Sequence, residues 1–160
     1  NLSPEVAINY YINEDTSIYV AYKKAFKSGG IDNSALPTAS INPLSPTFAG
    51  FDALIYDSEE VDGFEIGLKS NLLDNNMRLN ATYYKYEYTN LQVQLFDAAI
   101  IQFSTFNAGA VETEGFEADL LWYTDIPGLS LRGQFVWTDA TNTGDFITPG
   151  GENLKGSKRS

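Results

Sequence analysis

The strongest constraint in this sequence is an alternation of side chains with a period of two, which recurs in six separate segments. In the second segment, for example, Ile18, Val20 and Tyr22 alternate with neighbours that include Tyr19 and Lys23. This period is typical of a β-strand with one apolar and one polar face. The segments predict strands over residues 4–12, 16–28, 60–71, 77–95, 107–123 and 129–141. No segment has a convincing helical period, so the predicted fold class is all-β.

The connections between these segments alternate between short and long. Short turns rich in Asp, Asn, Pro and Gly fall at residues 13–15, 74–76 and 125–128. The other connections run from Gly29 to Glu59, from Asp97 to Phe106 and beyond Asn142. In an antiparallel meander this order places every long loop at the same end of the sheet, because the short turns take the other end. We therefore predict an antiparallel meander of about six long strands.

The alternation alone leaves two architectures open. A soluble β-sandwich turns its apolar face inward, whereas a transmembrane β-barrel turns it outward to lipid. Three features favour the barrel: long strands, aromatic residues near strand ends, and charges of both signs on the polar face. The run from Leu129 to Trp137 gives about 19 Å of height at a ~45° tilt, which nearly fills the ~25 Å apolar band of an outer-membrane barrel.

The barrel interpretation assigns individual residues to lipid or to the lumen. We expect lipid-facing side chains at Ile18, Val20, Ile66, Leu68, Leu120, Trp122, Leu131 and Phe135. We expect lumenal charges at Glu65, Lys69, Arg78, Glu117, Asp119 and Arg132. Opposite charges at mid-height suit a wet lumen, where they can pair.

The composition argues against catalysis, metal binding and nucleic-acid binding. The chain of 160 residues has no Cys and no His, which removes the commonest general base and the thiolate and imidazole metal ligands. Its 10 basic and 21 acidic side chains give a net charge of −11, which repels phosphate backbones. The acidic cluster from Asp57 to Asp62 lacks the spacing of a Ca²⁺ loop. We predict no enzyme activity, no catalytic residue, no metal site, no cofactor and no nucleic-acid partner.

Several runs of residues have a familiar order and spacing. They are YVAYKKAFKSGG at 19–30, EIGLK at 65–69, RLNATYY at 78–84 with LQVQ at 91–94, and Asn107-Ala108-Gly109 with Gly115-Phe116-Glu117. Each run is weak alone, but their order and spacing together are specific. They resemble successive barrel strands of TonB-dependent outer-membrane receptors, in particular siderophore receptors. The resemblance covers roughly residues 3–140.

This resemblance implies a plugged barrel of about 22 strands in the outer membrane of a Gram-negative bacterium. Such receptors import scarce nutrients, most often ferric siderophores, with energy that reaches them through the TonB protein. The implied partners are outer-membrane lipid and lipopolysaccharide, TonB, and a small-molecule ligand such as a ferric siderophore. We expect this chain to be a partial barrel domain from the C-terminal half, over residues 1–160, without the plug domain or the segment that contacts TonB.

Ligand-facing candidates lie near the predicted long loops. They are Tyr19, Lys23, Lys27, Phe48, Phe51, Tyr56, Tyr84 and Tyr86. Basic side chains can attract an anionic iron chelate, and aromatic rings can stack on a ligand. The same residues also suit packing, lumenal ion pairs or contacts with lipopolysaccharide, so both interpretations stay open. An alternative function is that of a soluble extracellular β-sandwich module that binds glycans.

Overall fold

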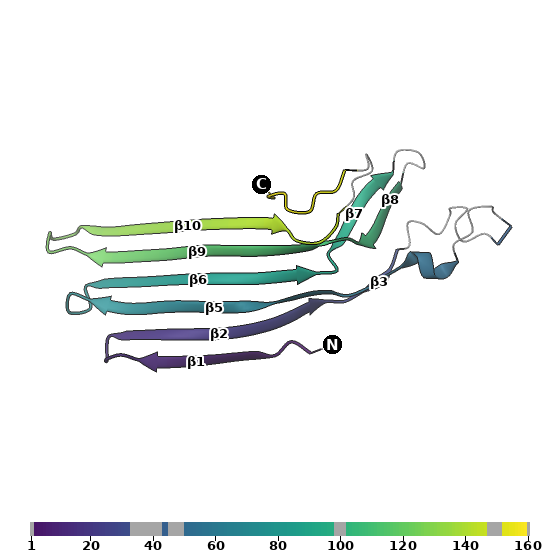
Figure 1. Cartoon of the computed structure of the whole chain (residues 1–160). Coiled ribbons are helices and arrows are strands. Elements are labelled where there is room, and N and C mark those ends of the chain that lie inside the picture. The colour runs from purple at the N-terminus through teal and green to yellow at the C-terminus, as the bar shows by residue number, and fades with distance from the viewer. Residues whose placement is uncertain (1, 33–42, 45–49, 98–101, 147–151, 160) are drawn as a thin grey trace.

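The chain builds one antiparallel sheet of six long strands and, beyond one end of it, two hairpins (Figure 1). The computed structural model describes residues 2–32, 43–44, 50–97, 102–146 and 152–159. In order across the sheet, the long strands are β1 (Glu5–Tyr11), β2 (Thr16–Lys27), β5 (Glu59–Leu72), β6 (Met77–Thr89), β9 (Ala110–Tyr123) and β10 (Ser130–Asn142). Neighbouring strands all pair in antiparallel register, so the prediction of an all-β meander of six long strands is confirmed.

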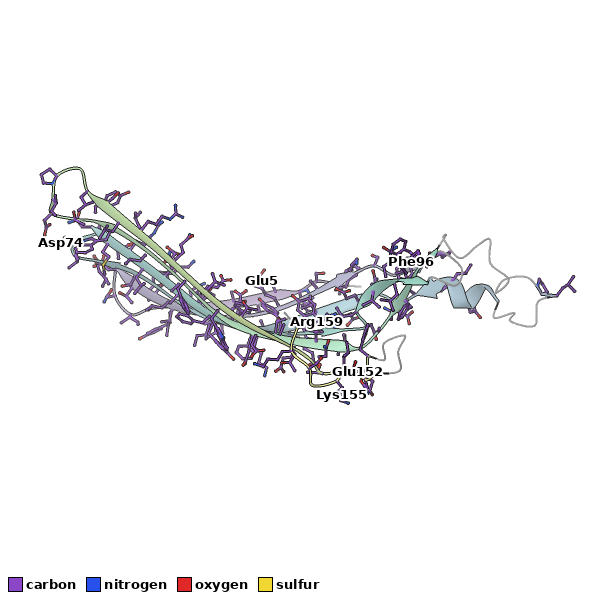
Figure 2. The ribbon with its side chains drawn as sticks, turned by 90° about the horizontal axis from the view of Figure 1, so that it is seen from above. Glu5, Asp74, Phe96, Glu152, Lys155 and Arg159 are labelled. Atoms are coloured by element: carbon purple, nitrogen blue, oxygen red, sulfur yellow. The ribbon has the colours of Figure 1, made fainter. Side chains whose placement is uncertain are left out.

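The short turns lie together at one end of the sheet, which Asp74 marks in Figure 2. In the β5–β6 turn, Asp74 and Asn75 have φ of 53° and 67°, a left-handed conformation that Asp and Asn tolerate better than most residues. In the β9–β10 turn, the Thr124 hydroxyl donates to the carbonyl of Leu129 at 3.0 Å, and Gly128 has φ of 80°. Residues with these conformational preferences therefore close the hairpins tightly, as their composition predicts.

The long connections lie at the opposite end, near Phe96 in Figure 2. The β2–β5 connection holds the hairpin of β3 (Gly30–Ile31) and β4 (Ile55–Tyr56), with the 3-10 helix η3 (Phe51–Leu54) before β4. The β6–β9 connection holds the hairpin of β7 (Gln92–Asp97) and β8 (Gln102–Asn107). The segments predicted as continuous strands over 77–95 and 107–123 are thus divided, because Asn90 and Gly109 have φ of 52° and 65° and interrupt the extended backbone.

The residues after β10 also stay at the loop end of the sheet. The N–H groups of Thr143 and Gly144 both donate to the carbonyl of Ala110, at 2.9 and 3.1 Å, so this connection lies against the start of β9. Further along, Lys158 forms an antiparallel bridge with Thr141 at the open edge of β10. All three long connections therefore gather at one end, as the meander predicts.

The strand register sorts side chains onto two chemically different faces. One row across the sheet contains Ile8, Val20, Ile66, Tyr83, Phe116 and Trp137. A row on the opposite face contains Ser17, Lys69, Asn80, Asp119 and Gln134. We call these the apolar face and the polar face. A slip of one residue would exchange them, because side chains alternate along each strand.

Neither face of the long sheet is covered by a second layer in the described part of the chain (Figure 1). Among the described residues, the buried hydrophobic side chains are Ala21, Leu54 and Val111 only. On the apolar face, Val20 is 48% exposed and Phe135 is 57% exposed. A β-sandwich would bury such a face against another sheet. No helix in the described residues is long and apolar enough to cross a membrane.

A tyrosine ring lies over a glycine on the polar face. Tyr19 of β2 stands directly opposite Gly67 of β5, and a Cβ atom added to Gly67 would overlap the Tyr19 ring. The Tyr19 hydroxyl extends past β5 and lies 3.1 Å from the Thr82 hydroxyl on β6, close enough to share a hydrogen bond. One side chain therefore links three neighbouring strands, and the missing Cβ of the glycine makes room for it.

The same arrangement repeats two strands further along the sheet. Tyr84 of β6 lies over Gly115 of β9, and its hydroxyl lies 2.8 Å from the Thr138 hydroxyl on β10. We call Tyr19 and Tyr84 the tyrosine straps. Since β6 supplies both the end of the first strap and the start of the second, the straps together link five of the six long strands.

A double-mutant cycle tests the first strap. Gly67→Ala should destabilise the fold by about 1–3 kcal/mol, because the new methyl group displaces the Tyr19 ring. In a Tyr19→Ala background the same change should cost less than ~0.5 kcal/mol. Gly133→Ala is the matched control, because nothing lies within 4 Å of a Cβ added there. Denaturant-induced unfolding measures each cost, and equal costs of Gly67→Ala in the two backgrounds would contradict the strap.

Candidate functional site

The apolar face changes abruptly into a charged surface at the loop end of the sheet. On five neighbouring strands, an aromatic residue of this face is followed towards the loop end by a charged one: Tyr22 and Lys24, Phe64 and Asp62, Tyr83 and Lys85, Phe116 and Glu114, and Trp137 and Asp139. On β2 one further aromatic residue, Phe26, stands beyond Lys24. Aromatic side chains at the edge of an apolar band, with charges directly beyond them, are the arrangement found at lipid–water interfaces. The face therefore has a well-defined boundary.

Charged side chains occupy this face beyond the boundary, and several of them pair with one another. They form what we call the charged collar: Lys24, Glu60, Asp62, Lys85, Glu87, Glu112, Glu114, Asp139 and Lys158. Lys24 pairs with Glu60 at 2.8 Å, and Lys85 pairs with Glu112 at 2.8 Å. These pairs are about one-third exposed and partly screened by solvent, so they set the character of the surface more than its stability.

Tyrosines at the boundary join the two zones. Tyr22 donates its hydroxyl to Asp62 at 3.2 Å, and Tyr83 donates to Glu114 at 3.0 Å. Each ring thus belongs to the apolar band, while its hydroxyl contacts the charged collar. This is the position that an amphipathic aromatic side chain prefers at an interface.

The two sets of wall residues predicted from the sequence fall on two opposite faces. The apolar face carries Ile18, Val20, Ile66, Leu68, Leu120, Trp122, Leu131 and Phe135. The polar face carries Glu65, Lys69, Arg78, Glu117, Asp119 and Arg132. The structure thus brings each set together, and the contact of the first set with lipid and of the second with a lumen stays a prediction.

The polar face carries a network of charges near the loop end. The ammonium group of Lys23 lies 3.0 Å from one carboxylate oxygen of Glu65 and 3.8 Å from the carboxylate of Glu5. The Tyr86 hydroxyl donates to the other oxygen of Glu65. Glu65 therefore has two donors, and its cation is Lys23 rather than one of the predicted lumenal charges.

Nearer the turn end, two charged side chains of the polar face contact neutral groups, one an amide and the other an aromatic ring. The Asn80 side chain donates to both carboxylate oxygens of Asp119, at 3.0 and 3.2 Å. Lys69 lies 5.4 Å from the centroid of the Tyr19 ring, within the range of a cation–π contact. The expected pairing of opposite charges on adjacent strands is thus replaced at these two residues by contacts with neutral groups.

The predicted ligand-facing residues divide into two groups. Tyr19, Tyr84, Tyr86 and Lys23 are held in the sheet by the contacts described above. The others belong to the loop end: Lys27 ends β2 and is exposed, Phe51 begins η3, and Tyr56 on β4 lies against Gly30 of β3. Phe48 lies outside the described residues. This second group therefore lies at the loop end, either at the end of β2 or on the β2–β5 connection.

An open groove lies at the base of the β3–β4 hairpin. Its volume is about 520 Å³, and its lining includes Phe26, Ser28, Ile31, Tyr56 and Asp57. Aromatic and polar groups are mixed there, which suits binding. Within the described residues, no group of three or more His, Cys, Asp or Glu is placed to hold a metal ion.

An aromatic pair on the β7–β8 hairpin was missed by sequence reasoning. Phe96 and Phe103 stand opposite each other with ring centroids 5.1 Å apart, and each side chain is 51% exposed. The alternation extended a strand to residue 95 and left residues 97–106 as a loop, so it contained no hairpin in which the rings could pair. A hairpin is predicted from a turn signal between its strands, and residues 98–101 are Ala-Ala-Ile-Ile, which contain no Gly, Pro, Asn or Asp.

Comparisons with known proteins agree with this architecture. The family profile described as TonB dependent receptor-like, β-barrel, matches residues 1–160. A probable TonB-dependent siderophore receptor from Acinetobacter baumannii, PiuA, is 29% identical over 147 residues, which are 91% of this chain and 18% of that receptor. The chain thus spans less than a fifth of the length of this curated relative.

Solved structures share the fold. The ferric yersiniabactin uptake receptor FyuA from Yersinia pestis matches with a TM-score of 0.61 and 20% identity, over 94% of this chain and 20% of that one. The ferripyoverdine receptor from Pseudomonas aeruginosa, bound to ferripyoverdine, matches with a TM-score of 0.56 and 18% identity, over 95% of this chain and 18% of that one. At these identities the likeness supports the fold alone.

The family of TonB-dependent receptors consists of outer-membrane β-barrel transporters and not of enzymes, in agreement with the prediction that this chain has no catalytic role. The meander, its apolar face and the family match over the whole chain lead to one conclusion. This chain belongs to the TonB-dependent receptor β-barrel family.

Proposed function

We propose that this chain forms part of the barrel wall and outer rim of a receptor that imports a scarce nutrient across the outer membrane with energy supplied through TonB. The observation that carries the proposal is the boundary of the apolar face on five neighbouring strands, at the same end as the long connections. Such a face suits contact with lipid, while the polar face suits a wet lumen and the long connections suit the cell exterior.

A ferric siderophore is the cargo that the comparisons favour for this receptor. The curated relative is described as a probable siderophore receptor, and two structural neighbours are receptors for ferric yersiniabactin and ferripyoverdine. We propose the same class of cargo here, ahead of haem, cobalamin or glycans. The groups that would meet it first are Lys27, Tyr56 and the Phe96–Phe103 pair at the loop end.

Two further partners follow from the same placement. The charged collar would lie at the level of the outer-leaflet head groups, where lipopolysaccharide presents phosphates and sugars to Lys24, Lys85 and their carboxylate neighbours. TonB would act through a part of the receptor outside this chain. We propose both lipopolysaccharide and TonB as partners of the full-length receptor.

The alternative, a soluble glycan-binding sandwich, requires burial of the apolar face. In the described residues no second sheet covers that face, and Val20 and Phe135 remain about half exposed. Exposing a continuous apolar sheet face to water is costly. We therefore favour the membrane receptor.

Iron uptake tests the proposal directly. The full-length receptor that contains this chain, expressed in a Gram-negative strain lacking its own siderophore receptors, should permit accumulation of radioactive iron from a ferric catecholate or hydroxamate chelate. Accumulation should stop when TonB is deleted, because the import is active. Uptake that persists without TonB, or a protein recovered in the soluble fraction rather than in outer membranes, would overturn the proposal.

Charge substitutions on adjacent residues of β10 test which face meets lipid. Phe135→Arg should destabilise the full-length receptor by ~2–4 kcal/mol, because it places a cation in the apolar band. Gln134→Arg should cost much less, since it faces the other way and stands opposite Asp119. Phe135→Leu measures the loss of the ring alone. Unfolding in lipid vesicles gives the three values, and similar costs for the two arginines would refute the assigned orientation.

A further inference from the structure

Two long connections are joined at the loop end by side chains that bond to backbone groups. The first connection runs from β2 to β5 and carries the β3–β4 hairpin, and the second runs from β6 to β9 and carries the β7–β8 hairpin (Figure 1). Three side chains, Asp32, Gln92 and Asn107, make contacts from one connection to the other. We call these three residues the loop latch.

Asn107, the last residue of β8, bonds to both connections. Its side-chain oxygen accepts from the N–H of Asp57 at 2.6 Å, and its amide nitrogen donates to the carbonyl of Asp57 at 3.0 Å. The same nitrogen donates to the carbonyl of Asn90 at 2.7 Å, where the chain leaves β6. One carboxamide thus pairs with Asp57 as a neighbouring strand would, and it also holds the start of its own connection.

Gln92, the first residue of β7, contacts both ends of the other connection. Its amide nitrogen donates to the carbonyl of Ser28 at 2.9 Å and to the carbonyl of Asp57 at 3.1 Å. Its backbone N–H donates to the Glu59 carboxylate at 2.9 Å. Ser28 and Asp57 lie near the two ends of the first connection, so Gln92 bonds to both of its ends from the second connection.

Asp32 adds a buried contact. Its carboxylate accepts from the backbone N–H of Thr105 on β8 at 2.6 Å, and the side chain is almost fully enclosed, with the residue 9% exposed. Its own N–H donates to the carbonyl of Leu54 at 2.8 Å. Burying a carboxylate is costly unless donors satisfy it, so moving β8 away from Asp32 removes a donor that this carboxylate needs.

Hydrogen bonds, more than an apolar core, account for the junction. Among the described residues of the two connections, Leu54 is the one buried hydrophobic side chain. We propose that Gln92 and Asn107 are positioning residues that hold the two connections together as one body, so that a ligand engaging either connection acts on both. The effect of a ligand rests on the proposed function, whereas the coupling of the two connections does not require a ligand.

Distances between spin labels on the two connections test the coupling in the full-length receptor. Ile55→Cys on β4 and Gln94→Cys on β7 place labels at exposed positions on opposite sides of the latch. The unchanged latch should give a narrow distance distribution. The isosteric pair Gln92→Glu and Asn107→Asp removes the donated hydrogen bonds and sets carboxylates against carbonyls, which should broaden the distribution roughly twofold by local opening.

Asn153→Asp is the matched control, because Asn153 makes its contacts within the third connection, including a bond to Asp145 at 2.9 Å. It should leave the distribution unchanged. Heat-modifiable gel mobility checks that each barrel is folded. A broad distribution in the unchanged receptor, or an unaltered distribution in the latch variant, would overturn the proposal.

A second measurement separates this proposal from the proposed function. Hydrogen exchange of the full-length receptor is compared with and without a ferric catecholate or hydroxamate chelate. Binding should protect both connections when the latch is intact and only one in the latch variant. Protection of one connection in the unchanged receptor would overturn the coupling. A receptor that transports no chelate but keeps a narrow label distribution refutes the import proposal and supports the latch.

Discussion

Strand register is the constraint on which the chemistry of this sheet depends. Side chains alternate between faces, so the pairing of β2 with β5 decides whether Val20 or Ala21 lies beside Ile66. A slip of one residue would move the row of Lys69, Asn80 and Asp119 into the apolar band. In a bilayer a cation such as Lys69 there would cost ~2–4 kcal/mol, so the proposed lipid environment would select against odd slips.

The tyrosine straps select against the slips that alternation allows. A shift of two residues between β2 and β5 would keep every side chain on its present face, but it would set Tyr19 against Glu65 or Lys69 in place of Gly67. Only the glycine leaves space for the ring to lie flat and reach β6. Hydrophobic patterning and steric fit are therefore complementary: the first excludes odd registers and the second excludes a shift of two residues.

The faces of the long strands could be predicted from the sequence because alternation is local and each strand carries it independently. The division of the fourth predicted strand could not. Leu91, Val93 and Leu95 resume the phase of Leu79, Ala81 and Tyr83 after the polar residues Lys85, Glu87 and Thr89, so the alternation marks no strand end at Asn90. The break is the left-handed backbone of Asn90, which a side-chain pattern does not encode. The contacts of Gln92 and Asn107 depend on that break, so they could not be predicted from the sequence either.

In the proposed receptor, the distribution of satisfied polar groups indicates where ligand discrimination can arise. On the polar face, Glu65 has Lys23 and Tyr86 as donors, and Asp119 has Asn80. Withdrawing such groups to meet a ligand would break contacts that hold the wall, so the wall is poorly suited to change with its cargo. The loop end is joined by amides bonded to backbone carbonyls, and these bonds depend on geometry more than on buried area. A rim built in this way can be well ordered at rest and still open locally, because separating it exposes little apolar surface.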